Sequence, residues 1–235
     1  PPSPPAPPSA PWVVSTTADL RSALADDAFG RIVLATGTYY LTAELDITRS
    51  VILEAAMAGS VVLDAGRVSG RRVLNMNSVM SKVVQLIGLN ITGGYTHGGG
   101  VLVQGGTVAI SSCNIYGNSI HPNSVGTQSG GGVFVLAGTV TITSSLIYGN
   151  TALHWGGGVA AWGGTVIVSS CTITGNTADR GGGVGNYLAA TSIISSDIYS
   201  NSAGLSGSQV QSWQQGTVCI LGDDPIAIWA RTLSG

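Results

Sequence analysis

A repeat that opens on three consecutive glycines limits this chain to very few folds. The triplets begin at residues 98, 130, 156 and 181, so they are 32, 26 and 25 residues apart. Each is followed by short runs of alternating apolar residues, as in "GGGVFVLAGTVTITSSLIYGN" from Gly130 to Asn150. A period in the mid-twenties with three short strands per repeat is typical of the coil of a parallel β-helix.

Stacked coils place equivalent residues above one another, about 4.8 Å apart. The alternation within strands predicts that one set of aliphatic side chains faces the interior: Val108, Ile110, Val140, Ile142, Val166 and Val168. Four asparagines recur at one turn position and predict a ladder of amides bonded to neighbouring coils: Asn118, Asn150, Asn176 and Asn201. The glycine triplets predict backbone corners with positive φ.

The two ends of the chain differ from the repeats. Seven of the nine prolines fall in the first eleven residues, and this density favours an extended polyproline II arm or linker over residues 1–12. A cap is expected over 13–30, with a short helix that Thr17 or Asp19 caps and that covers the first coil. The β-helix is expected over 31–224 and a C-terminal tail or cap over 225–235.

The repeat "GGGVxVxxGTVTIxxSxIxGN" resembles those of right-handed, single-stranded parallel β-helix proteins of the pectin-lyase-like superfamily. It is similar in particular to repeats of the polymorphic-membrane-protein and adhesin type, and the resemblance covers about residues 30–222. The resemblance implies an all-β solenoid. It also implies an alternative function, because many proteins with this fold cleave or isomerise acidic polysaccharides.

The acidic residues of the repeats do not favour such catalysis. Cleavage of acidic polysaccharides needs carboxylates gathered on one outward strand to hold calcium, or two or three that face one another. The four repeats contain only Asp179 and Asp197, at different positions, while Asp223 and Asp224 are interpreted as a solvated turn. His97 and His154 precede glycine triplets two coils apart, and Trp155 and Arg180 share that turn. They are interpreted as a surface turn, with sugar contact as the alternative. We therefore expect no catalytic residue, metal or cofactor.

Charge and hydropathy exclude several classes of partner. Charged residues make up 9% of the chain and the net charge is −2, so nothing favours binding to nucleic acid. No apolar run is long enough for a transmembrane segment. A surface with so few charges tends to associate unless sugars or partners cover it.

Aromatic residues recur at outward positions and are candidates for contact with a sugar or with another protein. Tyr116, Tyr148 and Tyr199 share one column, while Trp162 and Tyr187 share another. The candidate residues for an interface or for sugar stacking are Tyr116, Tyr148, Tyr199, Trp162, Tyr187, Trp155 and Trp229. The alternative is that the tyrosines merely cover their strands.

Two features suggest covalent sugars. Asn90-Ile91-Thr92 is an N-glycosylation sequon, and the strand alternation predicts that Asn90 faces outward. The segment "PPSPPAPP" resembles hydroxyproline-rich segments of plant and green-algal surface glycoproteins. That resemblance implies hydroxylation and O-glycosylation at Pro2, Pro4, Pro5, Pro7 and Pro8.

The three cysteines do not predict a disulfide. Cys113 and Cys171 occupy the same repeat position two coils apart, at about 9–10 Å, which is too far for a bridge. Both are therefore expected to be small buried residues, whereas Cys219 aligns with an outward column.

Together these patterns predict a non-enzymatic extracellular structural glycoprotein. It would be a β-helix subunit of a cell-surface, wall or filament assembly that associates with itself. The tail "PIAIWARTLSG" would either cap the last coil or dock onto the next subunit. The alternative is a carbohydrate-binding or polysaccharide-active β-helix module.

Overall fold

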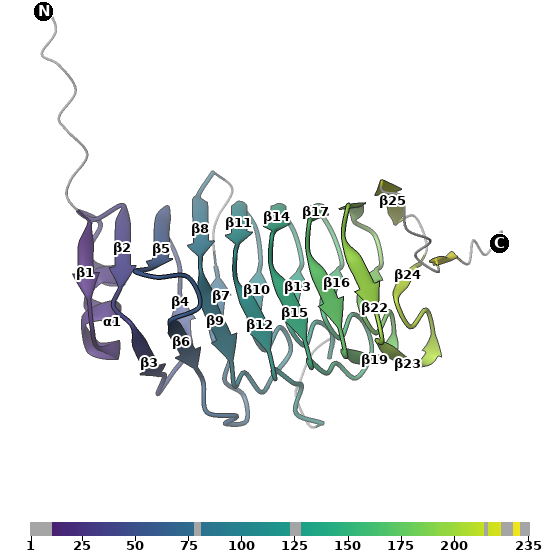
Figure 1. Ribbon diagram of the computed structural model, residues 1–235, viewed down its shortest axis with the longest axis horizontal. Coiled ribbons are helices and arrows are strands. Elements are labelled where there is room, and N and C mark those ends of the chain that lie inside the picture. Colours follow the sequence, from purple (N-terminus) through teal and green to yellow (C-terminus); the bar gives the residue numbers. More distant parts are fainter. Residues whose placement is uncertain (1–10, 78–80, 123–127, 214–215, 222–227, 231–235) are drawn as a thin grey trace, which may run out of the picture.

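The chain winds into a rod of stacked coils in which each coil contributes strands to three parallel sheets (Figure 1). The structure is a computed structural model that describes residues 11–77, 81–122, 128–213, 216–221 and 228–230. Strands of one sheet lie side by side along the rod, and every pairing between consecutive coils is parallel. The prediction of an all-β parallel β-helix is confirmed.

The described residues form sheets of nine, seven and eight strands and one two-stranded sheet. The nine-stranded sheet contains β1 (Trp12–Val14), β2 (Arg31–Leu34), β5 (Val51–Ala55), β8 (Val83–Ile87), β11 (Thr107–Ser111), β14 (Thr139–Thr143), β17 (Thr165–Ser169), β21 (Ala190–Ile194) and β25 (Thr217–Leu221). The seven-stranded sheet contains β3 (Gly37–Tyr40), β6 (Val61–Asp64), β9 (Leu89–Thr92), β12 (Asn114–Tyr116), β15 (Leu146–Tyr148), β18 (Thr172–Thr174) and β22 (Asp197–Tyr199). The eight-stranded sheet contains β4 (Leu45–Asp46), β7 (Leu74–Met76), β10 (Val101–Val103), β13 (Val133–Val135), β16 (Val159–Ala161), β20 (Val184–Asn186), β24 (Val210–Ser212) and β26 (Ile228–Ala230). The two-stranded sheet pairs β19 (Thr177–Arg180) with β23 (Ser202–Ser206).

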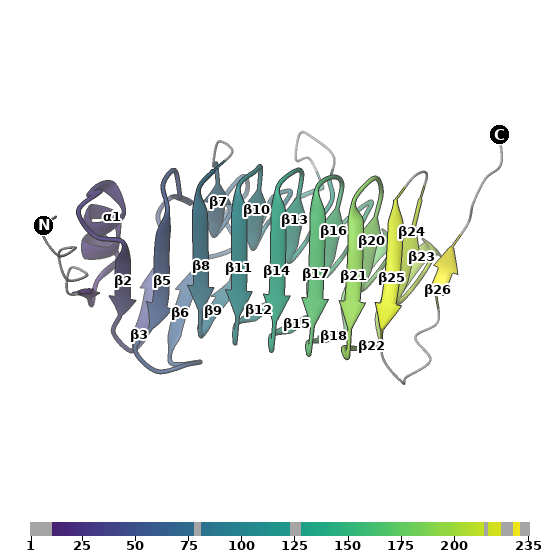
Figure 2. The same ribbon diagram turned by 90° about the horizontal axis from the view of Figure 1, so that it is seen from above.

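The first coil is covered by helix α1 (Thr17–Ala25), which lies at one end of the rod (Figure 2). The helix is capped by Thr16, whose hydroxyl accepts a hydrogen bond from the Asp19 backbone N–H, and not by Thr17 or Asp19 as expected. Leu20 and Ala23 are fully buried against the first strands. The N-terminal edge of the core is therefore closed.

Both ends of the β-helix extend beyond the expected boundaries. Trp12, expected in the arm, begins β1, which pairs with β2. At the other end, Ile228 of β26 pairs with Val210 of β24, so part of the expected tail adds a strand to the eight-stranded sheet.

The interior is built from in-register aliphatic columns, as the alternation predicts. Val108, Val140 and Val166 stack in one column of the nine-stranded sheet and are at most 1% exposed. The cysteines also lie where the pattern places them. Cys113 and Cys171 are free and buried, and burial raises the pKa of the Cys113 thiol to about 11. Cys219 is free and exposed.

The four turn asparagines form a continuous buried ladder of hydrogen bonds. The side-chain oxygen of Asn150 accepts bonds from both the backbone N–H and the side-chain amide of Asn118. Asn176 holds Asn150 in the same way, and Asn201 holds Asn176. Each amide also donates to a backbone carbonyl of the coil before it, so the ladder satisfies polar groups that the coils bury.

Glycine is needed in the triplets for two separate reasons, of which the sequence predicts only one. Their first glycines have positive φ, for example +62° at Gly156. The second and third glycines do not, but they lie against backbone of the neighbouring coil. A Cβ on Gly131 would lie 2.7 Å from the carbonyl oxygen of Thr151, and one on Gly132 would lie 2.6 Å from that of Gly158. Close coil contact therefore requires these glycines.

Candidate binding surface on the eight-stranded sheet

A row of side chains follows the outer edge of the eight-stranded sheet, one residue after each strand. The backbone N–H of Trp162 donates to Val135, that of Tyr187 to Ala161, and that of Trp213 to Asn186. These bonds place the three aromatic residues at equivalent positions of three successive coils. The same position is occupied by Gln104 and Leu136 in the two preceding coils, so the row becomes aromatic only towards the C-terminal end.

The aromatic rings of these coils contact one another. Trp162 and Tyr187 stack with ring centroids 5.1 Å apart. Trp155, from the preceding turn, packs edge-on against Tyr187 at 5.9 Å and against Trp213 at 6.0 Å. Trp162, Tyr187, Trp213 and Trp155 are hereafter called the aromatic row. Trp155 is only 8% exposed. It therefore packs beneath the partly exposed rings of Tyr187 and Trp213 and is not the exposed contact that the sequence suggested.

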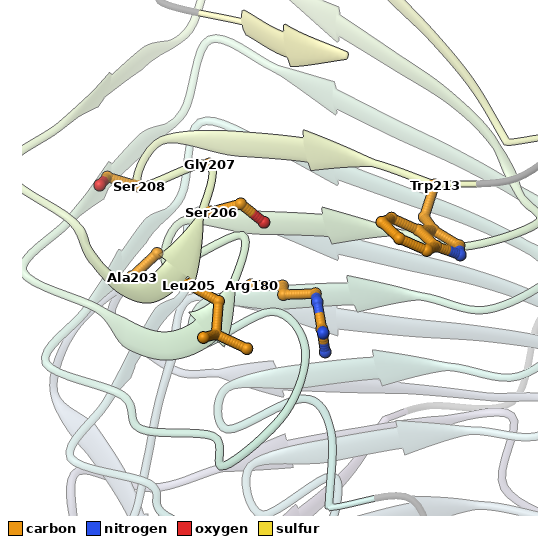
Figure 3. Close-up of a pocket in the computed structure, with 7 residues that line it drawn as sticks. All are labelled: Arg180, Ala203, Leu205, Ser206, Gly207, Ser208 and Trp213. Atoms are coloured by element: carbon orange, nitrogen blue, oxygen red, sulfur yellow. The ribbon is translucent and has the colours of Figure 1, made fainter. Parts of the chain in front are cut away.

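Arg180 connects the row to a cavity of about 530 Å³ (Figure 3). The Cζ atom of its guanidinium lies 5.5 Å from the ring centroid of Trp155 and 5.8 Å from that of Trp213, in cation–π contact with both. No carboxylate pairs with Arg180 in the described part of the chain. The cavity is lined by Arg180, Ala203, Leu205, Ser206, Gly207, Ser208 and Trp213. It therefore combines an apolar wall, hydroxyl groups and one cation with unused donors.

Trp213 and Phe134, which packs beneath Trp162, are not singled out by the sequence pattern. Trp213 follows a strand whose repeat begins Gly207-Ser208-Gln209, without a glycine triplet, so the triplet pattern does not align it with Trp162 and Tyr187 although the structure does. Phe134 is outward-facing yet only 1% exposed, because the turn at Gly130 folds over it and Trp162 packs against its ring. Both positions become clear only from the register of strands in neighbouring coils, which the structure supplies.

The tyrosine column lies on the seven-stranded sheet. Tyr116 and Tyr148 stack with centroids 5.1 Å apart and an interplanar angle of 11°. Thr174 interrupts the column, and Tyr199 beyond it is 52% exposed. Tyr199 therefore lies apart from the stacked pair, whereas the rings of the aromatic row contact one another over successive coils.

A polar network at the other end of the eight-stranded sheet was not anticipated. Arg72 pairs with Glu44 at 2.7 Å between Nη1 and Oε2, and it donates from Nε to the carbonyl of His97. Asn75 donates from Nδ2 to Asp46 at 2.7 Å. These residues precede the first glycine triplet, so a search of the triplet repeats for facing carboxylates misses them. The network connects the first coils through hydrogen bonds, and Arg72 neutralises Glu44.

His97 gives this network a pH-dependent stability. Burial lowers the pKa of His97, and the neighbouring Arg72 guanidinium lowers it further. The unfolded chain, with the ordinary His pKa of 6.5, therefore binds more protons than the folded chain as the pH falls below 6.5. The stability that is linked to neutral His97 is fully present above pH 6.5 and is lost as the pH falls through the folded-state pKa of His97.

We expect the urea midpoint to fall between about pH 7.5 and about pH 5, and His97→Gln to remove part of that fall. His154→Gln, at an exposed histidine two coils away, is the matched control. An unchanged pH dependence in His97→Gln would show that His97 is not the titrating group.

Asn90 does not face solvent as predicted. It is 8% exposed, its amide donates to the carbonyls of Gly59 and Val61, and its oxygen accepts from Asn114. A glycan would have to replace these bonds, which argues against N-glycosylation of the folded chain. The predicted O-glycosylation sites Pro2, Pro4, Pro5, Pro7 and Pro8 lie outside the described residues, as do Asp223 and Asp224. For Trp229 the structure describes only the backbone, which pairs with Gln211.

Comparison with known proteins finds no protein-family model, curated protein or solved structure that matches the chain. Within the described residues, no three His, Cys, Asp or Glu side chains gather closely enough to hold a metal ion. No helix among those residues is long and apolar enough to cross a membrane.

Proposed function

We propose that this chain is a non-catalytic structural module of an extracellular assembly. It would serve as a β-helix subunit of a cell-surface, wall or filament structure and carry a proline-rich arm. In this proposal the rod supplies a rigid body, and the aromatic row supplies its contact with other copies. The extracellular location rests on the resemblance of the arm to hydroxyproline-rich segments.

The observation that carries the proposal is the set of three partly exposed rings of the aromatic row beside Arg180, which forms no ion pair within the described residues. Tyr, Trp and Arg are the residues most enriched at the energetically important centres of protein interfaces. Trp162, Tyr187 and Trp213 are each partly exposed, and Trp213 lines the Arg180 cavity. On a chain with only 9% charged residues, such a surface favours association.

Sedimentation velocity on the full chain tests self-association. We expect the wild type to form dimers or larger species at micromolar concentrations, and Tyr187→Ala to raise the dissociation constant at least about tenfold. Tyr40→Ala is the matched control, because Tyr40 is a 69% exposed tyrosine on β3. A wild type that stays monomeric at about 100 μM would contradict the proposal.

A second candidate function is carbohydrate binding by the same surface. The observation that favours it is the cavity beside Trp213, where an indole, two serines and Arg180 could contact sugar faces and hydroxyls. A glycan array separates the two functions. Binding of a defined glycan that Trp213→Ala abolishes, without self-association of the wild type, would favour the carbohydrate-binding module.

A further inference from the structure

We propose that the aromatic row and the Arg180 cavity form a docking site for the proline-rich segment 1–11 of a second copy of this chain. This inference rests on the proposed self-association and names the segment that makes the contact. It joins two features that the fold keeps apart, a proline-rich arm that enters at the first coil and an aromatic surface on the last coils.

The segment "PPSPPAPPSAP" has the chemistry that an aromatic surface recognises. Proline-rich segments favour the polyproline II conformation before they bind, so docking costs little additional backbone conformational entropy. In that conformation the backbone makes no internal hydrogen bonds, and its carbonyl oxygens remain available as acceptors. The segment contains no charged residue, so its burial desolvates no side-chain charge.

The receptor surface complements this chemistry. Grooves lined with aromatic side chains are a recurring site for polyproline II ligands, because proline rings pack against flat rings. Trp162, Tyr187 and Trp213 offer such rings on three successive coils, and Leu205 adds an apolar wall that is 65% exposed. Arg180 forms no ion pair within the described residues, so its guanidinium donors can reach the carbonyls of a docked segment.

The reach of residues 1–11 favours a second copy over docking of this segment within its own chain. The arm joins the rod at β1, the first strand of the nine-stranded sheet. In that sheet β17, which follows Trp162, is six strand spacings from β1, about 29 Å along the rod. Eleven residues of polyproline II span only about 34 Å. In the same chain the arm would reach the row with one or two residues left to bind.

Docking between copies also determines how the assembly grows. The donor arm and the receptor row lie on different parts of the molecule, so the contact is heterologous and each added copy exposes a new site. Helix α1 closes the core at the donor end, and a head-to-tail contact would therefore use the arm and not the bare edge of the first coil. The expected product is an open chain of rods.

The test compares three variants of the full chain by sedimentation velocity. We expect Trp213→Ala and an arm variant (Pro4, Pro5, Pro7 and Pro8→Ala) each to raise the dissociation constant for self-association at least about tenfold. Tyr40→Ala should associate like the wild type. A synthetic peptide of residues 1–11 should bind the wild type, quench tryptophan fluorescence and dissociate the assemblies, whereas a peptide with the same four alanines should not.

The outcomes separate this inference from the proposed function. If the arm variant associates like the wild type while Trp213→Ala does not, copies associate through the row without the arm, and the inference fails alone. Equal binding of the peptide to wild type and Trp213→Ala would overturn it as well. A monomeric wild type would overturn both. A glycan that occupies the row and leaves peptide binding undetectable would favour the carbohydrate-binding function instead.

Discussion

Replacing Asn150 with alanine is expected to lower the free energy of unfolding by about 4 kcal/mol. Asn150 is fully buried. Its oxygen accepts the backbone N–H and the amide of Asn118, and its own amide donates to the carbonyl of Ile115 and to the oxygen of Asn176. Alanine would leave several of these buried groups without a partner, at about 1–3 kcal/mol each.

Urea denaturation followed by circular dichroism measures this loss. The matched control is Asn114→Ala, since Asn114 is half-buried in the preceding coil and its amide makes a single hydrogen bond within the described residues, to Asn90. We expect the control to cost about 1 kcal/mol. Equal losses in the two variants would mean that water replaces the ladder bonds and that the ladder contributes little to stability.

Substitution of Gly156 by alanine is the second large expected effect, again about 4 kcal/mol. A left-handed φ of +62° costs about 1–2 kcal/mol for a residue with a Cβ. The added Cβ would also lie 2.2 Å from the carbonyl oxygen of Val159 and 2.5 Å from the Cα of Ala160, so backbone must shift. Such overpacking adds about 1–3 kcal/mol.

Gly149 offers a control with the same backbone and no contact. Its φ is +61° and no atom lies within 4 Å of its would-be Cβ, so Gly149→Ala should cost only the conformational term, about 1–2 kcal/mol. The loss of stability in both variants is measured by the melting temperature and by the yield of soluble protein. If Gly156→Ala has the same melting temperature as Gly149→Ala, the turn from Gly156 to Ala160 is less tight than the structure shows.

The fold follows from the sequence because the repeats carry its register. The same spacing that aligns Val108 with Val140 also aligns the buried asparagines, so columns, ladder and strand direction all follow from one period. The second glycine of each triplet could be located but not explained. Its role depends on how closely the next coil approaches, which a one-dimensional pattern does not contain.

The candidate site was predicted less completely, for a related reason. Trp162 and Tyr187 lie in repeats with glycine triplets and could be aligned, whereas Trp213 follows a turn that lacks one. Burial depends on neighbours from other coils. Trp155 and Asn90 are at outward positions in the pattern but are covered in the fold, and Arg72 and Glu44 meet only because the first coils stack. Irregular coils are where the period gives least information.

Electron microscopy of the protein from its native source tests the central claim, that this rod is a self-associating structural subunit. The account predicts rods joined into extended chains, with the C-terminal coils that carry the aromatic row facing the N-terminal end of the next copy. Dispersed single rods, with additional density over Trp213 and Arg180 but no neighbouring copy, would contradict it and would favour a carbohydrate-binding module.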